Sequence, residues 1–122
     1  MNNSRDEFER VWPLLEPSLN IFGPTHTKFH VWDRVRLGHA FLWPSEKSAI
    51  LAEPITHPIG LRSLSVWLQG GDLAELKALH PHIEQWAREH YCDQLIAWGR
   101  DGWVRALDGW QNCGTRRRKV LG

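Results

Sequence analysis

Apolar residues near the start of the chain recur at the spacing of one helix face. They stand at i, i+3, i+4 and i+7, as Phe8, Val11, Trp12 and Leu15. This spacing predicts an amphipathic helix, and Ser4 followed by Glu7 forms a capping box at its start. We therefore expect a first helix over residues 5–16, with Pro13 kinking it or ending it early.

A second helix is expected over residues 27–37, because Thr27 is a good N-cap and Gly38 supplies a left-handed stop. After this helix the apolar period changes from helical to alternating. Three strands are predicted, over residues 39–43, 48–55 and 62–69. In the third strand, one face is expected to carry Leu64, Val66 and Leu68, and the other face Ser63, Ser65 and Trp67.

The second half of the chain alternates helices and strands. The segment Gly70-Gly71-Asp72 opens a helical stretch that keeps its apolar phase to His90, and Pro81 is expected to split it into two pieces. The apolar run 94–98 predicts a buried strand parallel to the strand before this helix, because a strand-helix-strand crossover normally pairs its strands in parallel. A short helix over residues 102–107 and two strands, over 110–113 and 115–121, complete the prediction.

This order predicts an α/β (α+β) fold with a mixed sheet. Its first half is antiparallel, one crossover adds a parallel strand, and a C-terminal strand pair closes it. With 122 residues, the chain is expected to form a single domain, 1–122. No apolar run is long enough for a membrane span and the first residues do not form a signal peptide, so we expect a soluble protein made in a cytoplasm, with no membrane partner.

The chain resembles a known family in the order of its elements. The order of elements is similar to that of the GNAT superfamily of N-acyltransferases, in the shortened form that tailed bacteriophages encode. Three segments carry the resemblance in sequence, and they cover residues 37–43, 83–87 and 99–105. The resemblance implies a GNAT-like mixed sheet and acetyl-CoA as the cofactor of any enzymatic activity.

In GNAT enzymes, backbone amides at the start of the crossover helix cradle the CoA diphosphate. The resemblance places this role on Gln69, Gly70, Gly71 and Asp72. A second interpretation is that the two glycines form a turn and Asp72 caps the helix, where its carboxylate would repel phosphate. The sequence leaves both interpretations open.

The catalytic groups that the resemblance implies are not evident. Many members use a Tyr in the helix after the second parallel strand as the acid, but this chain carries Trp103 there, and its only tyrosine, Tyr91, precedes that strand. Glu53 and Glu84 remain as candidate carboxylates. The catalytic residues are therefore unknown.

The strongest charge run, Arg116-Arg117-Arg118-Lys119, lies in the last predicted strand. It predicts either an edge strand protected by its charges or a contact with phosphate. The overall charge is only +1, which does not favour a nucleic-acid partner.

Eight tryptophans are more than one core of this size hides easily. Trp67, Trp103 and Trp110 are expected at the surface beside the basic run, and exposed tryptophan with arginine is typical of protein interfaces. His26 and His30 stand at i, i+4, but no third ligand accompanies them, so no metal is predicted.

Two functions are consistent with the sequence. In the first, the chain is a non-catalytic phage-type GNAT-fold protein that acts as a structural or assembly component of a virion or a related particle. It would contact other phage or particle proteins, or further copies of itself in a homo-oligomer, in the virion or the bacterial host cytoplasm, without a cofactor. In the second, it is an acetyl-CoA-dependent N-acetyltransferase.

Overall fold

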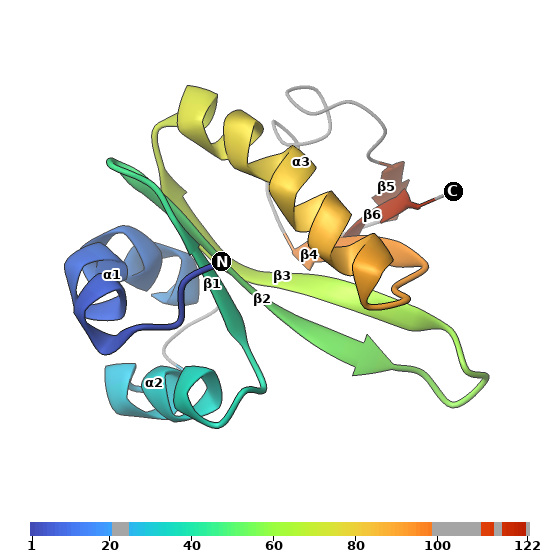
Figure 1. Ribbon diagram of the computed structural model, residues 1–122, viewed down its shortest axis with the longest axis horizontal. Helices are drawn as coiled ribbons and strands as arrows, with labels where there is room; N and C mark the ends of the chain where they lie inside the picture. The colour runs from blue at the N-terminus through green and yellow to red at the C-terminus, as the bar shows by residue number, and fades with distance from the viewer. Residues whose placement is uncertain (21–24, 99–110, 114–115, 122) are drawn as a thin grey trace.

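The computed structural model describes residues 1–20, 25–98, 111–113 and 116–121. Within these residues, three helices pack on a six-stranded sheet in the order β1-β2-β3-β4-β6-β5. The helices are α1 (Arg5–Leu19), α2 (Lys28–Arg36) and α3 (Leu73–Glu89), and the strands are β1 (Phe41–Pro44), β2 (Ser48–Thr56), β3 (Arg62–Gly71), β4 (Gln94–Trp98), β5 (Gln111–Cys113) and β6 (Arg116–Val120). Figure 1 shows α1 and α2 on one face of the sheet and α3 on the other. The predicted helix over 102–107 lies outside the described residues.

The sheet is mixed, as the sequence predicts. Strands β1, β2 and β3 pair antiparallel, β4 joins β3 in parallel through the α3 crossover, and β6 pairs antiparallel with both β4 and β5. The antiparallel first half, the single parallel crossover and the C-terminal strand pair are all confirmed.

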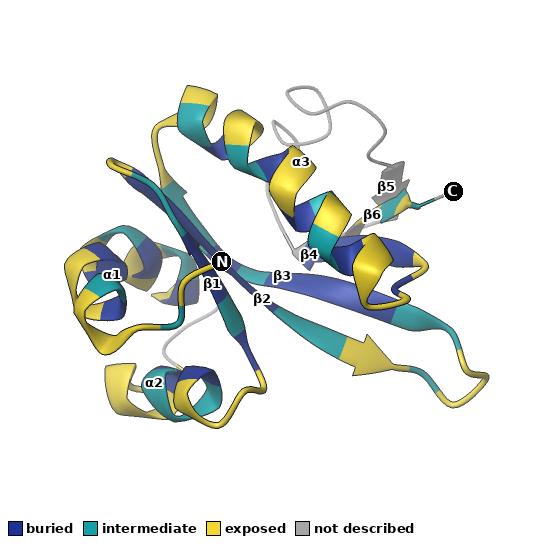
Figure 2. Cartoon of the chain, in the orientation of Figure 1, coloured by how far each residue is buried: buried dark blue, intermediate teal, exposed yellow. Residues whose placement is uncertain are grey.

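Both long helices run through their prolines. Contrary to the sequence predictions, α3 is not split at Pro81, and α1 does not end early at Pro13, which was one of two alternatives there. Helix α1 continues to Leu19 despite Pro13 and Pro17, and α3 continues to Glu89 despite Pro81. All three prolines are exposed, so each missing backbone hydrogen bond lies on the solvent side. Buried residues recur along both helices before and after the prolines (Figure 2), and their burial maintains the helices across the prolines.

The sheet separates two apolar clusters. On the α3 side, residues such as Leu64, Val66 and Ile83 are buried. On the α1 and α2 side, Phe8 and Leu51 belong to the second cluster. The sheet thus supplies both faces of the core, and each face is covered by at least one helix.

Strand β3 contains a β-bulge at Trp67. Leu51 pairs with Leu68, whereas the next residue of β2, Ala52, pairs with Val66, so Trp67 is the extra residue. A bulge shifts the alternation of side chains by one position. Leu68 therefore joins the α1 and α2 cluster, instead of sharing a face with Leu64 and Val66 as the simple alternation predicted.

Among the described residues, no helix is long and apolar enough to cross a membrane.

Candidate functional site

The two parallel strands part halfway along β3. Their pairing begins at Ser63 with Gln94 and ends at Val66 with Ala97. Beyond this point β4 continues to pair with β6, through Trp98 and Arg116, whereas β3 continues for five more residues to Gly71. We call the side of residues 67–71 that turns away from β2 the open edge of β3, because no described strand pairs with it.

Trp67 stands where the open edge begins. Its side chain is half-buried against the α1 and α2 cluster, and its ring meets that of His26 edge-on, with the centroids 5.0 Å apart. Trp67 was predicted to belong to an exposed interface, but part of its side chain packs against the core.

The helix α3 begins directly at the end of this edge, and its N-terminus is occupied by carboxylates. Asp72 caps the helix and accepts a hydrogen bond from the Glu75 N–H at 3.1 Å. Glu75 accepts from the Lys47 N–H at 2.8 Å and from the Ser48 hydroxyl at 3.3 Å. The Lys47 N–H, followed by the Ser45 hydroxyl, lowers the pKa of the Glu75 carboxyl, so this group is ionised at neutral pH.

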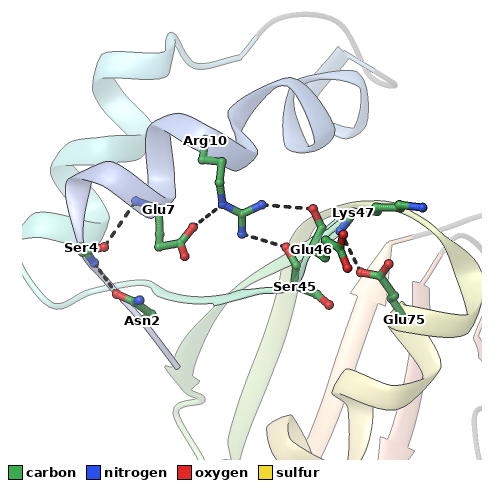
Figure 3. A network of polar contacts seen from close by, with 8 residues as sticks. All are labelled: Asn2, Ser4, Glu7, Arg10, Ser45, Glu46, Lys47 and Glu75. Atoms are coloured by element: carbon green, nitrogen blue, oxygen red, sulfur yellow. Dashed lines mark hydrogen bonds and ion pairs between the residues drawn. The ribbon is translucent and has the colours of Figure 1, made fainter.

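A polar network holds Glu75 in place from the opposite face of the sheet (Figure 3). Arg10 of α1 donates to the carbonyl oxygens of Ser45 and Glu46, at 2.8 and 3.1 Å. These residues form the turn between β1 and β2, and the next amide, that of Lys47, binds Glu75. The turn is thereby fixed between α1 and the start of α3.

The two glycines at this site are required by packing. A Cβ on Gly70 would lie 1.9 Å from the Leu14 carbonyl oxygen of α1, and one on Gly71 would lie 2.2 Å from the Lys47 carbonyl oxygen. Gly71 also has a φ of +115°, which L-residues rarely adopt. Close backbone contacts therefore account for both glycines. They are the last two residues of β3 rather than a turn, whereas Asp72 caps α3 as the second interpretation expects.

Gln69 pairs with Ile50 of the cluster on the α3 side, so its side chain lies on that face of the sheet. Its Oε1 is inaccessible to solvent and has no hydrogen-bond partner among the described residues. A buried acceptor without a donor costs about 1–3 kcal/mol. The sequence singles out Gln69 only through the family resemblance, and nothing in the sequence signals that its Oε1 lacks a partner among the described residues.

A second group of ionisable residues lies between α3 and β6. His80 is buried, and its burial lowers its pKa to about 4. The charge of Glu84 acts to raise this pKa, and the charge of Lys119 acts to lower it, both less strongly than burial does. Glu84 forms an ion pair with Lys119. The candidate carboxylate Glu53 pairs with Arg34 at 2.6 Å, so both candidate carboxylates are engaged by cations.

The remaining predicted interface residues are only partly described. Trp103 and Trp110 lie outside the described residues. Arg116, Arg117, Arg118 and Lys119 all belong to β6, where Arg118 is exposed and Lys119 half-buried. The side chain of Lys119 forms an ion pair with Glu84 of α3. In the strand register, Arg118 stands opposite Ile96 of β4.

The histidine pair of the sequence has a local structural role. The Nδ1 of His30 accepts the Thr27 N–H at 3.1 Å and completes the capping box of α2. In the part of the chain that the structure describes, no three His, Cys, Asp or Glu residues are grouped to hold a metal ion.

The comparisons with known proteins identify the fold. The sequence matches no family model and no curated protein. Among solved structures, the crystal structure of Tetrahymena GCN5, a GNAT acetyltransferase, matches with a TM-score of 0.54 at 9% sequence identity, over 100% of this chain and 93% of that chain. At this identity the likeness concerns the fold alone, and the chain has a GNAT-like fold.

Proposed function

We propose that this chain is a GNAT-fold protein without acyltransferase activity that acts through contacts with other proteins. The observation that supports this most is the occupied N-terminus of α3. Asp72 and Glu75 place two carboxylates where GNAT enzymes bind the CoA diphosphate, and they use the local donors themselves. Like charges repel, so these residues do not fit acetyl-CoA.

We infer the kind of partner from a resemblance to phage-type members of the GNAT superfamily, which lies in residues 37–43, 83–87 and 99–105. On that basis the chain is a structural or assembly component of a virion or a related particle, in the virion or the bacterial host cytoplasm. Quantitative mass spectrometry of gradient-purified particles tests this role. The protein is expected in the particle fraction at a fixed ratio to the other components, or in an assembly intermediate. Its restriction to the free-protein fractions would contradict the role.

One observation favours the alternative, an acetyl-CoA-dependent N-acetyltransferase. The strands β3 and β4 part beyond Val66 and Ala97, and the main-chain groups of β3 that no described strand pairs are able to hold an extended ligand. Proximity alone accelerates transfer when two reactants are held together.

A thiol-release assay separates the two functions. The purified chain is incubated with acetyl-CoA and either a lysine-containing peptide or spermidine, and free CoA is measured against time. We expect no release above the rate without protein. Saturable release that depends on the acceptor amine would refute the non-catalytic proposal.

A further inference from the structure

Helix α1 carries two prolines on its outer face. Pro13 and Pro17 stand one turn apart, both are exposed, and neither ends the helix. The outer side of α1 faces solvent, opposite the buried residues that pack on the sheet (Figure 2). Proline is the least favourable residue in a helix interior, because it lacks the N–H that bonds the carbonyl four residues earlier. The two prolines thus weaken this helix, and their exposed rings add little to the core.

The same prolines free hydrogen-bond acceptors at the surface. The carbonyl oxygen of Glu9 loses its helical donor at Pro13, and the carbonyl oxygen of Pro13 loses its donor at Pro17. The exposed Glu16 lies on the same side of the helix, and one of its carboxylate oxygens accepts the Trp12 indole N–H at 2.7 Å. We call the exposed residues of this side the proline face, and they are Glu9, Pro13, Glu16, Pro17 and Asn20.

The charge of the proline face favours a cationic partner. No basic residue lies in the last turn of α1, where the helix dipole adds partial negative charge. At the other end of the face, Glu9 is already paired with Arg5 and with Lys28 of α2. Glu16 forms an ion pair with no described residue. A cation is therefore attracted to the half of the face around Glu16, and an anion is repelled.

An arginine side chain matches this combination of groups. Its guanidinium is flat and weakly hydrated, and it carries its N–H donors in a fixed fork. The flat side can lie on a proline ring while the N–H groups at the edge donate to a carbonyl and to a carboxylate. A lysine ammonium has no flat side and is strongly hydrated, so it matches less well.

We propose that the proline face of α1 binds an arginine-bearing segment of a partner protein. The guanidinium lies on the rings of Pro13 and Pro17, and it donates to the Glu16 carboxylate and to the Pro13 carbonyl. This inference rests on the proposed function, because it names a surface through which the protein contacts its partner.

The test titrates two short peptides into the isotope-labelled full-length chain and follows the amide signals by NMR. The peptides are Gly-Arg-Gly-Arg-Gly and Gly-Lys-Gly-Lys-Gly, both capped at their two ends. We expect the arginine peptide to shift amides of residues 9–20 saturably, with a Kd at least threefold lower than that of the lysine peptide. Absence of saturable shifts in these amides, or equal affinity for both peptides, would overturn the proposal. Shifts that follow protein concentration without peptide would assign the face to a second copy of the chain, and would overturn it as well.

Replacing both prolines gives a test of opposite signs. The double variant Pro13→Ala with Pro17→Ala restores two helical N–H groups, so its Tm is expected to rise by about 5 °C or more. Its affinity for the arginine peptide is expected to fall at least threefold. The matched control is Pro81→Ala in α3, where the freed carbonyl belongs to an exposed cation, Lys77. The control is expected to raise the Tm without changing the affinity. Unchanged affinity in the double variant, or an equal loss in the control, would contradict the proposal.

Glu16→Gln isolates the contribution of the charge. The variant keeps an oxygen that can accept the Trp12 indole N–H, and it is expected to bind the arginine peptide at least threefold more weakly. Glu89→Gln removes one charge from the exposed end of α3 and is expected to leave binding unchanged. Equal effects of the two changes would show that the peptide responds to overall charge, and would refute the assignment to α1.

The outcomes also separate this inference from the proposed function. If acetyl-CoA is turned over in the thiol-release assay, the non-catalytic proposal fails, whatever the peptides do. If no turnover occurs and the arginine peptide leaves the amides of residues 9–20 unshifted, the proline face is not the docking surface and the non-catalytic proposal still holds.

Discussion

Replacing Gly70 by alanine tests whether this glycine serves packing between α1 and the sheet. The added Cβ would stand 1.9 Å from the Leu14 carbonyl oxygen, whereas real Cβ atoms essentially never come closer than 3.0 Å. The clash is with backbone rather than with a flexible side chain, so α1 and β3 must separate by about 1 Å, on the steric argument for overpacked sites. We expect a loss of about 3 kcal/mol in the free energy of unfolding.

The assay is urea denaturation followed by tryptophan fluorescence, with a thermal scan beside it. For a domain of this size, a loss of about 3 kcal/mol corresponds to a fall of about 12 °C in Tm. The matched control is Gly60→Ala, because Gly60 has a φ of +91° but open space around its Cβ position. The control is expected to lose only about 1 kcal/mol, from backbone strain alone.

A Gly70→Ala variant no less stable than the Gly60→Ala control would refute the reasoning. It would mean that α1 does not press on β3 at this point. The glycine would then have to be explained by another need, such as the approach of a ligand.

Two further predictions concern the helices. Because burial lowers the pKa of His80 to about 4, the unfolded chain binds its proton at a higher pH than the folded chain does, so stability falls as the pH drops from about 6.5 to 4. Measured by urea denaturation, the loss of stability between pH 6.5 and pH 4 is expected to be about 3 kcal/mol larger in the wild type than in His80→Leu. Replacing the exposed His82 by leucine is the control and is expected to leave this loss unchanged. An unchanged loss in His80→Leu would contradict the role given to His80. Arg10→Met removes the two hydrogen bonds to the β1–β2 turn and is expected to cost about 1 kcal/mol and to speed amide exchange at Lys47, and unaltered exchange would show that the turn does not depend on α1.

The sequence is informative about this fold where local chemistry decides the structure. The cap residues Ser4, Thr27 and Asp72 each accept a hydrogen bond from the third N–H of their helix, since a cap depends on the few residues around it. The capping box predicted at Ser4 is only half formed, because the Ser4 N–H donates to Asn2 Oδ1 and not to Glu7. The three middle strands and the parallel crossover also follow from apolar patterns along the chain. These elements suffice to indicate the GNAT-like topology.

The differences arise where tertiary contacts override local preference. Pro13 was expected to kink its helix or end it early, and Pro81 to split its helix. Both prolines stand on the solvent side, and the buried stripe continues past them. The bulge at Trp67 turns Leu68 to the α1 and α2 side of the sheet. No residue type in β3 indicates this bulge. A bulge is set by the pairing of two strands, so the alternation within one strand does not reveal it.

The candidate site was predictable only in part. The sequence points to Asp72 as a cap, but the hydrogen bonds of Glu75 join residues 28 and 27 positions apart in the chain. The parting of β3 from β4 and the burial of Gln69 Oε1 without a described partner likewise depend on long-range packing. Each of these features required the structure.

The measurement that tests the central claim most directly is a calorimetric titration of acetyl-CoA into the wild type and into the double variant Asp72→Asn with Glu75→Gln. If the carboxylates occupy the anion site of the fold, the wild type gives no detectable heat at millimolar acetyl-CoA. The double variant then binds acetyl-CoA no more weakly than the wild type does. Micromolar binding by the wild type, or binding that weakens when the two charges are removed, would contradict the account.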